Sequence, residues 1–268
     1  MTLKSSHTAL QHFVETCRKL VFDECFVVPG DWLKAIPDLP DWVKEDNGDN
    51  DIIDSYSTLP QPYITHVGEH ILALVQVLEP FASSNENLFY AKKVMNDVNV
   101  LSRGAWSELA SLLGCVDDTS HGEDVQVINS IMSGENLPDY VRTIDYLNSE
   151  EEDDESHASD EGHMFCNEWL QVVSTALVGR LLERILRIQK LSSKGLEHLS
   201  TDLNYIENVF SALGIDGHPH PLLHHLSYLV GLGEDDFEAY LRERHTSTTK
   251  MDEAIQMLES RLANIRRN

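Results

Sequence analysis

Apolar side chains recur every three or four residues in five stretches of the chain, and this spacing is the strongest constraint on its fold. The five stretches are residues 10–20, 64–81, 165–190, 196–213 and 251–265. A helix places such residues on one face, which is stable when another element covers it. No stretch alternates with a period of two over the length of a strand. The sequence therefore predicts an all-α protein in which antiparallel helices pack into bundles.

Differences between the stretches predict how the helices are arranged. In residues 165–190, additional apolar side chains widen the face, so this helix is expected at the centre of the bundle. Weaker patterns predict shorter helices around residues 88–101, 106–113 and 125–132.

Local signals mark where several helices begin and end. Pro62 suits the first position of a helix. Pro80 excludes the residue before it from helical backbone, so we expect the second helix to end there. Gly214 stands where a left-handed residue commonly ends a helix. Thr249 and Asp252 are spaced to cap the last helix.

Two acidic stretches, residues 37–61 and 147–163, interrupt the helical pattern. The second contains an unbroken run of Asp and Glu at residues 150–155. Because like charges repel and such runs bury no apolar surface, both stretches are predicted to be acidic disordered loops. The chain of 268 residues is therefore expected to divide into N-terminal helices at 1–146, a linker at 147–163 and a C-terminal bundle at 164–268.

The charge balance excludes several classes of partner. Asp and Glu number 45 and Lys and Arg number 20, which gives a net charge of −25. Nucleic-acid binding and electrostatic docking to anionic lipid both need clustered cations. No apolar run reaches the ~20 residues of a membrane-spanning helix, and the first residues contain no apolar signal core. We expect a soluble, cytosolic protein with no membrane insertion.

The cysteines fit the same compartment. Cys17, Cys25, Cys115 and Cys166 form no Cys-x-x-Cys pair. In a chain of this size they are predicted to be reduced thiols, partly buried in helices, rather than a disulfide framework.

One cluster has the spacing of a metal site. His220 and His224 would share a helix face if a helix began near Pro219 or Pro221, and this spacing can ligate zinc. The favoured interpretation is a turn that opens a short helix with an apolar core face, so that the histidines of residues 218–225 face solvent. That core face comprises Leu222, Leu223, Leu226 and Leu229. Common phosphate-binding, nucleophile-elbow and zinc-protease motifs are absent, so we assign no catalytic residue, metal or cofactor.

The acidic run has two functional interpretations and a structural one. Ser149, Ser156 and Ser159 are flanked by acidic residues, which makes them phosphorylation candidates for an acid-directed kinase. The run is also suited to docking a basic partner. A solvated linker without either role is the favoured interpretation.

Two motifs carry a resemblance to a known family. Residues 59–71, Leu-Pro-Gln-Pro-Tyr-Ile-Thr-His-Val-Gly-Glu-His-Ile, and residues 199–214, Leu-Ser-Thr-Asp-Leu-Asn-Tyr-Ile-Glu-Asn-Val-Phe-Ser-Ala-Leu-Gly, resemble signatures in the C-terminal region of subunit seven of the conserved oligomeric Golgi complex. Residues 17–23 and 167–170 are also similar, and all four fall in the family's order. The resemblance covers most of residues 10–90 and 163–266 and is absent from 91–162.

The resemblance implies a fold and a function. The family's members are non-enzymatic subunits of a vesicle-tethering complex, built from helical bundles that stack into a rod. The complex acts on the cytosolic face of the Golgi as a peripheral membrane assembly. It captures vesicles in retrograde intra-Golgi transport and so maintains Golgi glycosylation.

Partners follow from the same resemblance. Subunit seven shares a lobe with subunits five, six and eight, and the complex cooperates with SNARE proteins and small GTPases. The family provides no catalytic residues to transfer, and it leaves the binding surfaces of this chain unassigned. The net charge supports one alternative, an acidic adaptor or chaperone that binds basic proteins and loses them at high salt.

Overall fold

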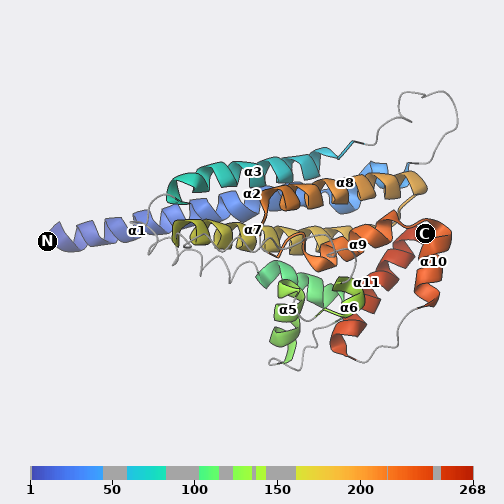
Figure 1. The fold of residues 1–268 in the computed structure, drawn as a ribbon. Coiled ribbons are helices and arrows are strands. Elements are labelled where there is room, and N and C mark those ends of the chain that lie inside the picture. Colours follow the sequence, from blue (N-terminus) through green and yellow to red (C-terminus); the bar gives the residue numbers. More distant parts are fainter. Residues whose placement is uncertain are drawn as a thin grey trace, which may run out of the picture.

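The computed structural model describes residues 2–44, 59–82, 103–114, 123–134, 137–142, 161–215, 217–243 and 249–267. Every regular element in these ranges is a helix, which confirms the predicted all-α class. The long helices are α1 (Thr2–Phe22), α3 (Pro62–Ala82), α7 (Glu161–Ile185), α8 (Ser193–Leu213) and α11 (Lys250–Arg267). Helix α3 packs against both α7 and α8, and α1 runs out of one end of this layer (Figure 1).

Shorter elements complete the bundle. Between α1 and α3 the chain forms η1 (Asp23–Val27), α2 (Val28–Leu33), η2 (Ile36–Asp38) and η3 (Pro40–Val43). A helix at residues 103–112, α5 (Glu123–Ser133) and α6 (Asp139–Arg142) precede α7. Near the C-terminus, α9 (Pro221–Gly231) and α10 (Glu234–Arg242) connect α8 to α11. The expected helices near 106–113 and 125–132 are thus confirmed, and the one near 88–101 lies outside the described residues.

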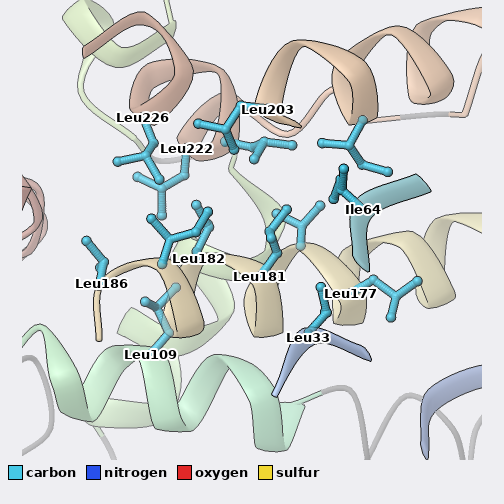
Figure 2. Close-up of a cluster of buried hydrophobic side chains, with 14 of the residues drawn as sticks. Leu33, Ile64, Leu109, Leu177, Leu181, Leu182, Leu186, Leu203, Leu222 and Leu226 are labelled. Carbon is cyan, nitrogen blue, oxygen red and sulfur yellow. The ribbon is translucent and has the colours of Figure 1, made fainter. Parts of the chain in front are cut away.

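Helix α7 lies at the centre of the core, as its wide apolar face predicts. Leu177, Leu181 and Leu182 project from it toward several neighbouring helices, and Leu186 follows directly after its last residue (Figure 2). The core includes Leu33 from α2, Ile64 from α3, Leu109 from the helix at 103–112, Leu203 from α8, and Leu222 and Leu226 from α9. A helix with apolar side chains on several sides is stable only when other helices cover them.

The cap signals act as the sequence predicts. Helix α3 begins at Pro62. Gly214 ends α8 with φ of 58°, a left-handed conformation that glycine adopts without a steric penalty. Asp252 N–H donates to Thr249 Oγ1 at 3.1 Å, and Thr249 N–H donates to Asp252 Oδ2 at 3.0 Å, so the two residues cap α11 reciprocally.

The predicted end of α3 at Pro80 is wrong, because the helix continues to Ala82. Proline lacks an N–H and crowds the carbonyl four residues earlier. In the last turn of a helix, a proline removes one backbone hydrogen bond, and the helix can continue past it.

The predicted acidic loop at residues 37–61 is wrong at its first residues and at its last, Gln61, which is buried. Residues 36–43 form η2 and η3 and bury Ile36 and Trp42. The Trp42 indole donates to the Ile36 carbonyl, which satisfies its polar atom in the core. Apolar anchors therefore outweigh the acidic composition here, whereas residues 45–58 lie outside the described residues.

The predicted linker at 147–163 also overlaps a helix. Helix α7 begins at Glu161, and residues 147–160 lie outside the described residues. Helices from both sides of the linker contribute to one hydrophobic cluster, since α3 packs on α7 and α8. The division into 1–146 and 164–268 stays a prediction.

Three cysteines are described, and all are free thiols, as expected. Cys25 and Cys166 are buried and Cys17 is partly exposed, while Cys115 lies outside the described residues. Burial raises the pKa of the Cys25 thiol to about 11. The Cys166 thiol donates to the Leu78 carbonyl at 3.4 Å and so joins α7 to α3.

Gly195 provides a test of the contact between α8 and η3. A Cβ atom at Gly195 would lie 2.3 Å from the Trp42 carbonyl oxygen, so Gly195→Ala must displace backbone. We expect Gly195→Ala to lower the free energy of unfolding by about 2 kcal/mol or more, measured by urea denaturation. Gly30→Ala is the matched control, because a Cβ there meets nothing within 4 Å. Equal stability of the two variants would contradict this packing.

Candidate functional site

Among the described residues, α1 carries a run of exposed apolar side chains. Among its side chains, Leu10 is 62% exposed, Phe13 65% and Leu20 62%, and Val14 and Val21 are also exposed. The helix predicted at residues 10–20 is therefore confirmed, but its apolar face is not covered by any part of the chain that the structure describes. Contiguous exposed apolar side chains mark interaction sites in soluble proteins.

The spacing of this face indicates the kind of partner it suits. The apolar residues occupy three of every seven positions, the pattern of a helix that faces the core of a bundle. We call this surface the α1 face; it comprises Leu10, Phe13, Val14, Cys17, Leu20 and Val21. Lys4, Arg18 and Lys19 outnumber the single carboxylate of α1, Glu15, although the whole chain has a net charge of −25. The α1 face is therefore suited to pack against an amphipathic helix.

The two motifs that carry the family resemblance meet at a buried carboxylate. Asp202 in α8 is 1% exposed. Its Oδ1 accepts the Gln61 N–H at 2.7 Å, and its Oδ2 accepts the Tyr63 hydroxyl at 2.6 Å. Burial raises the pKa of Asp202 to about 6, although both hydrogen bonds favour the charged form. Asp202 thus caps the start of α3 from a different helix.

Close packing extends this junction along α3. A Cβ atom at Gly68 would lie 2.6 Å from the Tyr205 hydroxyl oxygen, so glycine lets α8 approach α3 at this point. Residues 59–71 and 199–214 are therefore core elements that fix how α3 and α8 meet.

The expectation that the histidines of residues 218–225 face solvent is wrong for His220 and His225, which are buried. His220 caps α9: its Nδ1 accepts the Leu222 N–H at 3.2 Å, and its Nε2 donates to the Met132 carbonyl at 3.2 Å. Its ring lies against Trp106, with centroids 4.9 Å apart. Burial lowers the pKa of His220 to about 4, so it is neutral at pH 7.

The other three histidines also have partners. His218 hydrogen-bonds Thr175 Oγ1 at 3.2 Å, and burial together with the neighbouring His220 lowers its pKa to about 3. His224 Nδ1 lies 3.4 Å from Glu207, and His225 Nε2 lies 3.3 Å from Glu259. The histidines thus join helices instead of converging on one point.

The other part of this prediction, which concerns the apolar core face, is confirmed. The expected core face of α9 is buried; it comprises Leu222, Leu223, Leu226 and Leu229. Within the described residues, no group of three or more His, Cys, Asp or Glu side chains is placed to hold a metal ion.

Two further predictions concern other parts of the chain. The phosphorylation candidates Ser149, Ser156 and Ser159 lie outside the described residues and stay predictions. A search of the described helices for a membrane span, judged by length and apolar character, finds none.

Comparison with known proteins identifies related chains. Residues 1–106 match the family model described as Golgi complex component 7. The subunit 7 proteins of the conserved oligomeric Golgi complex from Bos taurus and Homo sapiens are each 22% identical over 237 residues, which is 88% of this chain and 24% of the relative. The Arabidopsis thaliana subunit 7 is 23% identical over 203 residues, 76% of this chain and 16% of the relative.

These matches confirm the resemblance to subunit seven. The chain spans about a quarter or less of the length of these relatives. Their names describe a subunit of a complex and no reaction. No solved structure matches the chain.

The hydroxyl of Tyr63 tests the junction of α3 and α8. Tyr63→Phe removes one donor to Asp202 and leaves a buried carboxylate with one hydrogen bond fewer. We expect the free energy of unfolding to fall by about 1–2 kcal/mol in a urea titration. Tyr228→Phe is the control, because Tyr228 is half-exposed. An unchanged midpoint for Tyr63→Phe would show that the bond contributes nothing to stability.

The burial of His220 predicts an acid-sensitive fold. Its folded pKa lies below the ordinary value of 6.5, so the unfolded chain binds more protons between pH 6.5 and 4. Stability is fully present above pH 6.5 and falls as the pH drops toward 4. From pH 7 to 4.5, His220 alone is expected to remove about 2 kcal/mol.

The variant His220→Asn isolates this effect, because asparagine also caps helices and does not titrate. The free energy of unfolding of each protein is measured at both pH values. We expect the loss between pH 7 and 4.5 to be smaller in His220→Asn than in the original chain. An equal loss in the two proteins would assign the acid sensitivity to other groups.

Proposed function

We propose that the chain is a non-enzymatic scaffold subunit of a Golgi vesicle-tethering complex, working through protein–protein contacts. Its partners would be other subunits of the conserved oligomeric Golgi complex, with five, six and eight in the same lobe. SNARE proteins and small GTPases would contact the assembled complex. The role is retrograde intra-Golgi transport, which maintains Golgi glycosylation, at the cytosolic face of the membrane as a peripheral protein.

The α1 face is the observation that carries this proposal. Within the described residues, a helical bundle with a buried core presents a row of exposed apolar side chains along α1. The related proteins are named as subunits of a complex, so another subunit is the natural source of a covering helix. Each large apolar side chain that becomes fully buried contributes about 1.5–3 kcal/mol to such an interface.

The position of α1 supports stacking of bundles into a rod. Helix α1 leaves the end of the bundle along the direction of the long helices α3 and α7 (Figure 1). A partner helix that packs against the α1 face would lie beyond that end and extend the bundle lengthwise. Several weak contacts of this kind add up through effective concentration in a complex with many subunits.

Three substitutions on α1 test the proposal. The tagged chain is purified from cells that contain the whole complex, with and without Leu10→Ser, Phe13→Ser and Leu20→Ser together. We expect the original chain to recover other subunits at moderate and at high salt, and the triple variant to recover at least tenfold less. The substituted residues are exposed, so circular dichroism should show that the rest of the bundle folds normally.

A control variant outside α1 separates loss of the α1 face from a general loss of exposed apolar surface. Leu59→Ser with Val77→Ser changes two exposed apolar residues outside α1 and should leave recovery unchanged. Full recovery by the triple variant would remove α1 as the docking surface. Recovery of basic proteins alone, lost at high salt, would favour the acidic adaptor instead.

A further inference from the structure

A groove of about 490 Å³ lies where the end of α7 meets α11 and the helix at 103–112. Its floor includes the apolar side chains of Leu112, Leu186 and Ile265. Arg187, Arg261 and the amide side chains of Gln189 and Asn264 also line it. We call this surface the arginine groove.

The arginine groove differs from the other large grooves in charge. No Asp or Glu is among its described lining residues, in a chain with 45 acidic and 20 basic residues. The groove beside α10 is lined by Glu197, Glu234 and Glu238 together with arginines. The groove beside α2 includes Asp31 and Glu108. The groove beside α2 also contains Lys34, Arg180 and Arg184, so the arginine groove is distinguished by its lack of carboxylates and not by cations alone.

The cations of the groove are only partly neutralised. The Arg187 guanidinium pairs with buried Glu183, but Glu183 also lies 3.1 Å from Arg184 and 3.7 Å from Arg180. One carboxylate thus serves three arginines, and Glu108, which pairs with Arg180, is the second carboxylate of the cluster. Positive charge remains in excess beside the groove.

Arg261 adds an unsatisfied donor. Its Nε atom is buried and has no hydrogen-bond partner within the described residues. The positions that face it one turn away on α11 are Met257, Leu258, Asn264 and Ile265, and none is a carboxylate. A guanidinium in this state favours a carboxylate that is brought by another molecule.

We propose that the arginine groove binds an acidic segment of a partner protein that also carries apolar side chains. The arginines would pair with its carboxylates, and the apolar floor would receive a leucine or phenylalanine between them. A free anion would leave the floor uncovered, and an anionic membrane would be repelled by the net charge of −25. This inference rests on the proposed function, because it adds a second contact surface to the same scaffold subunit.

A synthetic peptide tests the groove directly. Fluorescein-labelled Glu-Asp-Leu-Glu-Asp-Phe-Glu-Asp is titrated with the purified full chain at low salt, and binding is followed by fluorescence anisotropy. We expect saturable binding that Arg261→Gln and Gln189→Glu each weaken about tenfold, as expected for the loss of a charge-assisted hydrogen bond. Gln189 is exposed, so Gln189→Glu changes the charge of the groove without altering the core.

Two control variants make the same charge changes elsewhere. Arg242→Gln on α10 and Asn204→Asp on α8 are both at exposed positions outside the arginine groove, and both should bind the peptide as the original chain does. If peptide binding is weakened equally in the control variants, the effect is due to the net charge of the chain, and the proposed site is overturned. Absence of peptide binding by the original chain would also overturn it.

Two competitors distinguish other sources of negative charge. Inorganic phosphate and vesicles of phosphatidylcholine with phosphatidylserine are added to the complex with the peptide. We expect neither to displace the peptide at equal concentration of anionic groups, and displacement by either would overturn the choice of an acidic segment. The assay does not involve the α1 face, so its failure is separate from loss of complex subunits in the α1 variants.

Discussion

The whole arrangement depends on the burial of α7, in which no residue from Val172 to Ile185 is exposed. Its leucines contact residues from α2, α3, α8, α9 and the helix at 103–112 (Figure 2). Because the apolar side chains of α7 point in several directions, the helices that cover them have to come from distant parts of the sequence. The order of the helices in the chain therefore matters less to the fold than their shared contact with this one element.

Burial around such a helix forces the polar groups of the core to find partners. Asp202 caps α3, His220 caps α9, and Glu259 accepts the Tyr240 hydroxyl at 2.8 Å. A buried polar group without a partner costs about 1–3 kcal/mol, so each of these bonds restricts how the helices can be arranged. Apolar packing supplies most of the stability, and these bonds select one arrangement of the helices.

The sequence predicts the faces of the helices better than their partners. Periodicity identifies α3, α7, α8 and α11, and glycine or hydroxyl caps mark several of their ends, because these signals are local. Pairing of Asp202 with Tyr63 spans 139 residues, and no local pattern indicates it. The burial of His220 was missed for the same reason, since its partner Met132 lies 88 residues away. The short helices η2 and η3 were missed because the acidic and proline-rich composition around Trp42 conceals its role as an anchor.

For the candidate surfaces too, the sequence indicates local features but not contacts between distant residues. The apolar spacing of α1 could be seen in the sequence, but whether the rest of the chain covers it could not. The arginine groove is lined by residues at the end of α7 and on α11. Its positive charge can therefore be recognised only from the folded structure, in which these residues lie together.

Helix α1 also raises a question of stability, because most helices in proteins owe their stability to the packing of an apolar face. Alone in water, a helix of 21 residues is only moderately stable. The contacts that would attach a partner to the α1 face are the same contacts that would stabilise the helix itself. Helix content and binding should therefore rise together, and part of the binding free energy is used to order α1. An interface of this kind is specific because of its apolar pattern and readily reversible because ordering the helix offsets part of its affinity.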